Sequence, residues 1–469
     1  MPKITISEKD LTSPGFIDNT SNIVYVPGLA KRLPKDFKEN TPRLYTTLSS
    51  FQYDFGDKVP TIGLGTLSST NYPGFGDGGA YDTGYIYATE LLRLGCPVLY
   101  DCFNKICTND STKYIIKNPT STSGGTTTSA TIPTTAGEDY WLNVNDDDSY
   151  MRDTYATSAS TIVGKNILRD KGLYNIKFVS NGGYEEFNNG IIELAAARQD
   201  CVALPDIKYI NKKFTITSTT TAADILSSND LSTLTEGQAK YSALFAPWAT
   251  YELPCIKNYV NTPATTAQAK TIYYPSLYEM PGSFGYLMAM ASAIQSGASN
   301  WVAMAGASRG QIPYLKEVSM HITEAIIDIL QTRNGKSINP ITTINPFGVV
   351  VWGNRTLYDN SAKGNLTASS FLNIRNLCSD VKKTVWTTAR RMTFEQNSDI
   401  LWVNFKSHIT PLLDQMVTSG CLSGYELKKR ANKQKAELRA VVRLYPIEAV
   451  EDFEIEIQLA DDTTTTIEA

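Results

Sequence analysis

Apolar and polar residues alternate with a period of two at both ends of the chain. Near the start, Ile4 and Ile6 of the segment KITIS share one face. Near the end, the segment FEIEIQLA places its apolar side chains on one face and its acidic and amide side chains on the other. The apolar residues of this second segment are Phe453, Ile455, Ile457 and Leu459. Both termini are therefore predicted to form half-buried strands.

Between the termini, strand and helix patterns alternate in three similar units. In the first unit, Asp82 is placed to cap a helix at its N-terminus and Gly95 to end it. Each unit is a strand, an amphipathic helix and a second strand. Their ranges are 22–28, 82–95 and 96–103, then 174–180, 188–200 and 201–207, then 271–275, 283–297 and 301–307. Three strand-helix-strand units predict a mainly parallel α/β sheet.

Two polar stretches do not fit this sheet. Residues 118–137 are a low-complexity Thr/Ser/Gly segment, which is typical of a surface insertion, and we extend this insertion to about residues 108–165. Residues 212–265, which include TSTTTAAD, are a second candidate insertion. We therefore expect an α/β core that is interrupted twice by polar chain.

The C-terminal third has a different pattern. From Asp380 on, apolar residues recur at helical spacing in two segments that are separated near Asn397 and Ser398, and Gly420 ends the second. Closing strands follow, with Pro446 between them. This order predicts an α+β unit behind the α/β core.

Composition excludes several classes of protein. The chain has 469 residues, with 42% apolar and 19% charged residues and a formal net charge of -4, so neither nucleic acid nor a membrane is an expected partner. Its first ten residues lack the apolar core of a signal peptide. Seven cysteines without a CxxC pair indicate reduced thiols, and only two histidines, His321 and His408, weigh against zinc chemistry. We expect a soluble chain made in a cytoplasm, with no cofactor.

Two short motifs suggest enzyme activity. GFGDGG at residues 74–79 has the spacing of a dinucleotide-binding loop, but Pro73 and a polar loop separate it from any strand. GASRG at residues 306–310 places Ser308 upstream of His408, in the order of a serine hydrolase. Pro313 disturbs the helix that should follow such a serine. A tight turn and a packed histidine are the favoured interpretation.

An acidic cluster could hold a cation. Asp146, Asp147 and Asp148 offer carboxylate oxygens, which calcium prefers, yet the segment lacks the glycine and the distal glutamate of an EF-hand loop. A solvated acidic loop is the favoured interpretation. We therefore expect no metal site, and no enzyme hypothesis gains good support.

The C-terminal third contains an ordered series of motifs. Its most specific segment is VVVWGNRTL, an apolar strand that ends in a tryptophan and an arginine. It is followed by an N-x-R segment, a helix ending near F-E-x-N, a helix beginning x-LW, and a late P-x-E-x-x-x-F strand. The residues of these motifs are Trp352, Gly353, Arg355, Thr356, Leu357, Asn373, Arg375, Phe394, Glu395, Asn397, Leu401, Trp402, Pro446, Glu448 and Phe453. In this order of motifs the chain resembles the tail sheath proteins of contractile phages and related injection machines, and the resemblance covers most of its length outside the two insertions.

This resemblance implies a structural protein rather than an enzyme. It implies a subtilisin-like α/β core without a working triad, and subunits that form stacked hexameric rings around a tail tube. The expected partners are further copies of the chain, the tube protein, and the baseplate and tail terminator proteins. The expected location is a virion tail, assembled in the host cytoplasm. The corresponding domains are an arm at 1–18, a core at 19–345, and a C-terminal sheath domain at 346–469 whose arm begins at about 451.

The terminal strands fit this assembly. A strand at a free chain end must pair with a sheet edge in its own subunit or in a neighbour, and in sheaths both arms cross to neighbours. We therefore expect residues 3–7 and 453–460 to be exchanged, which links subunits while they turn as rigid bodies during contraction. A basic run is either a tube contact or a solvated helix face. It consists of Lys428, Lys429, Arg430, Lys433, Lys435 and Arg439.

Three functions remain open from the sequence. The first is a phage tail sheath, and the second is the sheath of a bacterial injection device. One chain carrying the entire fold favours a phage or a phage-like particle. The third is a serine hydrolase that uses Ser308. We also expect Trp352 to pack the junction between the core and the C-terminal helices, and Arg355 to bind a carboxylate or backbone carbonyls there.

Overall fold

The computed structural model describes residues 22–30, 34, 41–57, 59, 61–62, 80–102, 105–106, 114–115, 167–217, 219–259, 273–362, 364, 366–431 and 438–447. Several sequence predictions lie outside these residues. They are the two terminal strands (Ile4, Ile6, Phe453, Ile455, Ile457 and Leu459), the motif at 74–79, the stretch at 118–137, the cluster Asp146, Asp147 and Asp148, and the residues Lys433, Lys435 and Glu448.

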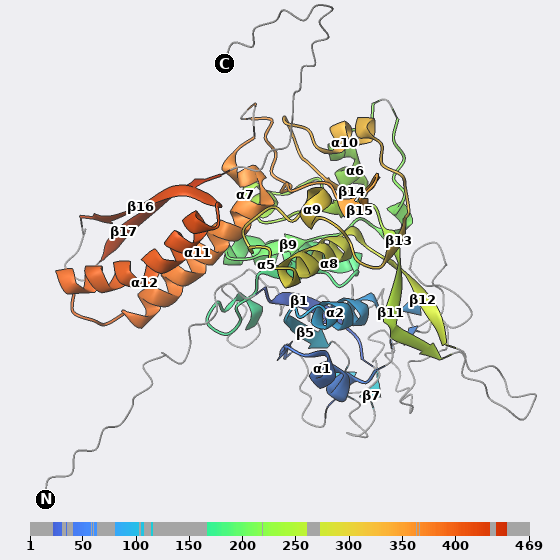
Figure 1. Ribbon diagram of the computed structural model, residues 1–469, viewed down its shortest axis with the longest axis horizontal. Helices are drawn as coiled ribbons and strands as arrows, with labels where there is room; N and C mark the ends of the chain where they lie inside the picture. Colours follow the sequence, from blue (N-terminus) through green and yellow to red (C-terminus); the bar gives the residue numbers. More distant parts are fainter. Residues whose placement is uncertain are drawn as a thin grey trace, which may run out of the picture.

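A five-stranded sheet in the order β2-β5-β1-β8-β9 forms the centre of the molecule (Figure 1). Strand β1 is parallel to β5 and β8, β8 is parallel to β9, and β2 is antiparallel at one edge. The strands are β1 (Val24–Gly28), β2 (Arg43–Tyr45), β5 (Val98–Cys102), β8 (Phe178–Ser180) and β9 (Val202–Leu204). This sheet confirms the first two predicted strand-helix-strand units.

Helices cover both faces of this sheet. Val26, Val98 and Phe178 pack with helices α1 (Leu48–Phe55), α2 (Thr83–Arg93) and α8 (Gly282–Gln295). The alternate residues Tyr25 and Val179 pack on the opposite face with α5 (Asn188–Arg198). The strands therefore bury both faces, which explains their nearly continuous apolar sequences.

Local signals set the ends of α2 as predicted. The carboxylate of Asp82 accepts hydrogen bonds from the backbone N–H groups of Gly84 and Tyr85, at 3.1 Å each. Gly95 has a positive φ of 77°, which a glycine adopts without steric cost after a helix end.

The third predicted strand-helix-strand unit is wrong in its strands. The first strand becomes β12 (Tyr273–Met280), which pairs antiparallel with β11 (Ala249–Tyr259), and β13 (Leu315–Val318) joins the other side of β11. Residues 301–305 form no strand. Trp301 is buried against helices of the C-terminal unit, whereas Met304 is buried in the cluster that includes α8, so burial produced the apolar run without a ladder of hydrogen bonds.

A second small sheet carries the strand of the sheath-like motif. It has the order β10-β14-β15, with β10 (Phe245–Ala246), β14 (Asn339–Ile344) and β15 (Gly348–Val351). Strands β14 and β15 form a hairpin that crosses the residue 345/346 boundary expected from the sequence. The short helices α9 (Gly306–Arg309) and α10 (Glu324–Leu330) lie near it.

The chain between β9 and β10 packs into the core. Helices α6 (Ala222–Ser228) and α7 (Glu236–Lys240) begin with capping boxes at Thr221 and Thr235. Ile225 and Leu226 are buried in the same apolar cluster as α5. This part of the region 212–265 therefore belongs to the hydrophobic core.

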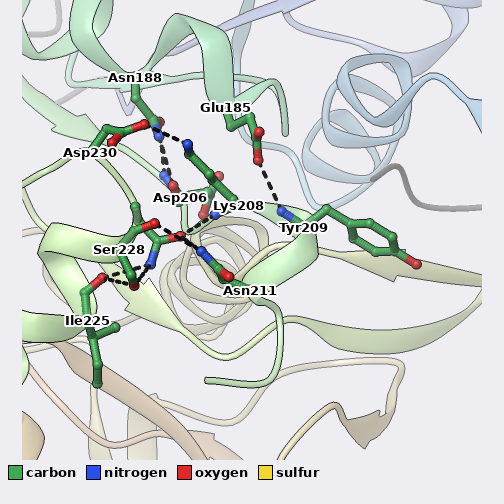
Figure 2. Close-up of polar contacts among 10 residues, drawn as sticks. Glu185, Asn188, Asp206, Lys208, Tyr209, Asn211, Ile225, Ser228 and Asp230 are labelled. Carbon is green, nitrogen blue, oxygen red and sulfur yellow. Dashed lines mark hydrogen bonds and ion pairs between the residues drawn. The ribbon is translucent and has the colours of Figure 1, made fainter. Parts of the chain in front are cut away.

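The loop after β9 is held by side-chain amides and a carboxylate, as Figure 2 shows. The amide of Asn188 donates to the carbonyl of Asp206 at 2.8 Å and accepts from its N–H at 3.1 Å. Glu185 accepts from the N–H of Tyr209 at 3.1 Å, and Asn211 donates to the carbonyl of Ser228 at 3.1 Å. These contacts tie η2 (Glu185–Phe187) and η3 (Tyr209–Asn211) to α6.

The C-terminal residues form a helical hairpin and a two-stranded sheet that project from the α/β body (Figure 1). The hairpin consists of α11 (Leu372–Arg391) and α12 (Asp399–Thr418), and the sheet of β16 (Leu422–Arg430) and β17 (Arg439–Pro446). The predicted break is confirmed, since Ser398 caps α12. The first helix begins at Leu372 rather than at Asp380.

The remaining elements are short. They are β3 (Thr61–Ile62), β4 (Ala80–Tyr81), β6 (Lys105–Ile106), β7 (Tyr114–Ile115), η1 (Ile167–Arg169) and η4 (Ala368–Ser370). In the described part of the chain, no helix is long and apolar enough to cross a membrane, and no cluster of three metal-binding side chains occurs. Among the described residues, Cys96, Cys201, Cys378 and Cys421 form no disulfide.

Candidate functional site

The motif residues 352–357 follow strand β15 directly, and most of them are buried. The backbone N–H of Trp352 donates to the carbonyl of Pro340 at 2.8 Å, so the chain remains pinned to β14 after the strand ends. At Gly353, a Cβ atom would lie 2.2 Å from Nε2 of Gln331 and 2.7 Å from Oδ1 of Asn339. Only glycine fits this close approach.

Arg355 is buried, with 5% of its surface exposed. Its Nη1 donates to the carbonyl of Thr332 at 2.8 Å. The side chain of Asn339 brackets its backbone, accepting from the N–H and donating to the carbonyl, both at 2.7 Å. The sequence-based hypothesis that Arg355 binds carbonyls therefore agrees with this contact, whereas the role of Asn339 had no sequence signal.

Asn354 connects the motif strand to the first turn of α11. Its Nδ2 donates to Oδ1 of Asn373 at 2.8 Å, and its Oδ1 accepts from the N–H of Asn373 at 3.2 Å. The carbonyl of Asn354 also accepts from the N–H of Leu372 at 2.9 Å. Asn373, a motif residue, thus joins the strand and the helix through both its backbone and its side chain.

The tryptophan that packs this junction is Trp301, not Trp352. Trp352 is only half-buried and belongs to none of the buried apolar clusters of the described residues. Trp301 is 3% exposed and packs with Leu377 and Val381 of α11 and with Phe405 of α12. The prediction for Trp352 is therefore corrected: this residue uses its backbone, and an aromatic residue 51 positions earlier fills the junction.

Buried charges reinforce the same junction. The ammonium of Lys177, at the start of β8, lies 3.2 Å from Oδ2 of Asp380 on α11, and both side chains are at most 1% exposed. The indole N–H of Trp301 donates to the same oxygen at 2.8 Å. Lys383 donates to the carbonyl of Ile176 at 2.7 Å, and burial lowers the pKa of its ammonium. Sequence reasoning missed this network.

Arg375 also links α11 to the α/β body. Its Nη2 donates to Oγ of Ser369 at 2.7 Å, and its guanidinium lies 5.1 Å from the ring centre of Tyr241. Lys382 approaches the same ring at 5.0 Å and donates to its hydroxyl at 2.5 Å. Two cations on α11 therefore share one tyrosine that follows α7.

A second group of motif residues lies at the far end of the helical hairpin, whereas Pro446 pairs with Leu422, which packs in the cluster of Trp301. Phe394 has a φ of 76° and a fully exposed side chain, and Glu395 and Asn397 next to it are exposed. Trp402 packs against the apolar cluster between the helices and stacks on Phe405 with 5.8 Å between ring centres. The motif thus marks two places, the junction and the hairpin tip.

The basic residues that are described lie on strands rather than on a helix face. Lys428, Lys429 and Arg430 end β16, and Arg430 pairs with Arg439 at the start of β17. Lys429 is 2.8 Å from the carboxylate of Asp399, and Lys428 pairs with Glu426. The interpretation of this run as a solvated helix face is therefore wrong for these residues, and its contact with a tube stays a prediction.

Ser308 and His408 do not come together. Ser308 is exposed on α9, whereas His408 is exposed on α12, and these helices lie apart in Figure 1. Nδ1 of His408 lies 2.7 Å from the carbonyl of Asn404, one turn earlier. His408 is thus not the packed histidine that the sequence predicted, because Phe405 and Ile409 fill the buried side of the helix.

A serine probe tests this arrangement directly. We expect purified protein to show no labelling by an active-site serine reagent above that of the Ser308→Ala variant, because Ser308 lies on α9 and the histidine of the proposed pair lies on α12. Mass spectrometry of the labelled chain measures the difference. Labelling that is lost in Ser308→Ala would contradict a structural role.

The carboxyl edge of the central sheet, where α/β enzymes commonly bind ligands, is occupied by the protein's own groups. Asp82 accepts from the N–H of Leu29 at 2.7 Å and from the hydroxyl of Tyr184. Asp206 accepts from the hydroxyl and the N–H of Ser283, at 2.7 and 3.0 Å. Burial raises the pKa of each carboxyl to about 7. Asp82 caps the N-terminus of α2 and Asp206 that of α8, so both carboxyl groups have a structural role.

Replacement of Arg355 should destabilise the junction. In Arg355→Ala, the carbonyl of Thr332 loses a charged donor inside the protein, and we expect a loss of about 2 kcal/mol of unfolding free energy. Urea unfolding followed by tryptophan fluorescence measures the change. Arg309→Ala is the matched control: its Nε also donates to a backbone carbonyl, that of Ala303, at 3.0 Å, but its side chain is exposed on α9. Equal effects of the two changes would contradict a structural role for Arg355.

Solved structures reveal the same fold. A chain in the contracted-state baseplate of the anti-feeding prophage (AFP) matches with a TM-score of 0.56 at 16% identity, covering 99% of both chains. A chain in the 6-fold symmetrised AFP baseplate matches with a TM-score of 0.54 at 13% identity, covering 98% of this chain and 99% of that one. The contracted PVC sheath complex of an extracellular contractile injection system gives 0.46 at 16% identity, covering 99% and 98%.

No protein-family model matches the chain, and no curated protein does. At these identities the comparisons show the fold. The chain thus has a mixed α/β fold that also occurs in chains of the AFP baseplate. In particular, its fold extends along the full length of a chain from the AFP baseplate.

Proposed function

We propose that the chain is a structural subunit of a contractile sheath, which polymerises around a tube and shortens to drive that tube forward. The match to an AFP chain over 99% of both chains carries this proposal, because no part of the described fold is left over for another task. The tail-sheath motif supports it, since Gly353, Arg355 and Asn373 have distinct structural roles at one junction.

Strand exchange would connect the subunits. Strands β16 and β17 pair with each other and with no further strand among the described residues, and a two-stranded sheet is a weak unit on its own. Val442, Leu444 and Tyr425 pack one face of this sheet on the helical hairpin. Residues 453–460 of a neighbouring subunit would add a strand to the edge of this sheet, with their apolar side chains on its packed face and their acidic side chains on its exposed face. Residues 3–7 of a neighbour would add a strand in the same way.

In this proposal, residues 1–18 are an arm, 19–345 the core and 346–469 the sheath domain. Subunits form stacked hexameric rings and turn as rigid bodies during contraction, while the exchanged strands keep them connected. The extended lattice is metastable, and contraction buries more surface between subunits. The energy is stored during assembly, so the mechanism needs neither ATP nor a metal ion.

The proposed partners are other copies, the tube protein, and the baseplate and terminator proteins. The tube contact would include the exposed residues Lys428, Lys429 and Arg430 of β16. A phage or a phage-like particle is the favoured setting over a two-chain bacterial device, because one AFP chain spans the same complete fold. The sheath would assemble in the cytoplasm of the host bacterium.

Electron microscopy tests the proposal most directly. Purified protein is expected to form tubes or rings when it is concentrated, because the linking strands belong to the same chain. Negatively stained grids and analytical ultracentrifugation of the same sample measure this. A chain that stays monomeric at every concentration, with or without tube protein, would argue against a sheath.

A further inference from the structure

A small cavity lies where α11 meets the α/β body. Its volume is about 40 Å³, which is room for roughly three water-sized groups and thus for one carboxylate or small oxyanion. One wall comes from the loop after η1 and the end of α5, and the other from α11. The lining residues that matter here are Lys171, Asp200, Lys382, Lys383 and Trp386.

Hydrogen bonds within the protein hold the side of the cavity that is formed by the end of α5 and the loop after η1. The guanidinium of Arg198 holds Asp200 with two hydrogen bonds, at 2.9 and 3.2 Å. It also donates to the carbonyls of Leu168 and Tyr174, which locks the loop that carries Lys171. Arg390 of α11 reaches the same loop, where a Cβ at Gly172 would lie 2.2 Å from its Nη1. The cavity is therefore preorganised.

The charges around this cavity do not balance. Arg198 neutralises Asp200. Lys382 donates to the carbonyl of Gln199 and to the hydroxyl of Tyr241, and Lys383 donates to the carbonyl of Ile176. These acceptors are neutral.

Lys171 adds a third positive charge to the lining of the cavity. It forms no hydrogen bond or ion pair with any residue that the structure describes, and it is only half-buried. Three ammonium groups and one carboxylate therefore line the cavity, and this carboxylate, of Asp200, is already bound by Arg198. Burial lowers the pKa of Lys383, against the opposing effect of Asp380 and Asp200.

We propose that this cavity binds a single carboxylate or oxyanion group between Lys171 and Lys383. The indole of Trp386, 38% exposed and stacked with Arg390 at 5.1 Å, forms an apolar rim that strengthens charge pairing by excluding water. Two sources offer this chemistry. One is a free oxyanion such as phosphate. The other is an acidic side chain of a second copy, and this source rests on the proposed function.

The C-terminal residues supply suitable carboxylates for the second source. Residues 448–469 contain eight acidic side chains and no lysine, arginine or histidine. Their charge is therefore complementary to the cavity. In a polymer, such a contact would connect the C-terminal segment of one copy to the junction between α11 and the α/β body of the next.

The experiment uses Lys171, because it carries no structural hydrogen bond. The melting temperature of the unassembled chain is measured in phosphate and in chloride at matched ionic strength, for the native chain, Lys171→Gln and the control Lys406→Gln. Lys406 is exposed on α12. A free-oxyanion site predicts that phosphate raises the melting temperature by about 2 °C in the native chain and in Lys406→Gln, but not in Lys171→Gln.

The second arm measures the protein concentration at which polymers form. If a second copy fills the cavity, Lys171→Glu raises this concentration about tenfold, whereas Lys406→Glu changes it less than about twofold. No phosphate effect together with equal behaviour of the two glutamate variants would overturn the proposal. A native chain that never polymerises would contradict the sheath function instead, and the phosphate measurement would still decide whether the cavity binds an anion.

Discussion

Chains that lack residues 1–10 or residues 451–469 are expected to fold as monomers and to lose polymerisation. Each deletion removes a predicted edge strand and leaves every residue of the described core in place, so the melting temperature should stay close to that of the full chain. It also removes the backbone hydrogen bonds that would complete a neighbour's β16–β17 sheet. Loss of about 3 kcal/mol per contact would raise the concentration needed for assembly roughly a hundredfold.

Light scattering and negative-stain microscopy of the two truncated chains measure this effect, and circular dichroism verifies their folding. The matched control removes residues 118–137, a polar segment of similar length to the C-terminal deletion, and should leave assembly intact. Ordinary tubes from both truncated chains would show that strand exchange is not the link between subunits.

The sequence predicted those parts of the fold that local signals control. Asp82 and Gly95 bound α2 because a cap and a left-handed glycine act within a few residues of the helix. The break at Ser398 has the same origin. Periodicity also identified two parallel units correctly, since strands buried on both faces are continuously apolar.

Prediction failed where a pattern has more than one structural solution. The apolar run at 301–307 was interpreted as a strand, but an extended segment buried against helices has the same pattern. The prediction that Trp352 packs the junction failed for a related reason. Trp352 ends one apolar run and Trp301 begins another, and only the packing of α11 decides which of the two is enclosed.

The charged part of the junction had no local pattern at all. Lys177 and Asp380 are 203 positions apart, and neither lies in a recognisable motif. A single sequence cannot bring such residues together. The family-like motif did locate the neighbouring contacts of Arg355 and Asn373, because their segment has a distinctive order of residue types.

Replacement of Asp380 by asparagine is expected to produce the largest loss of stability of any single change at the junction. The amide keeps the shape of the side chain and can still accept from Trp301, but the ammonium of Lys177 is left buried without its counter-charge. Breaking such a pair costs about 3–5 kcal/mol. Because Asp380 lies on α11, the helical hairpin should loosen from the α/β body first.

A double-mutant cycle separates this effect from a general loss of packing. Lys177→Met removes the stranded charge, so Lys177→Met/Asp380→Asn should recover much of the stability that Asp380→Asn loses. Asp399→Asn is the matched control: the same residue type also pairs with a lysine, but its side chain is 97% exposed, and its replacement should have little effect. Urea unfolding followed by tryptophan fluorescence measures all four variants. If Asp380→Asn were no more harmful than Asp399→Asn, the buried pair would not be what holds α11 on the sheet.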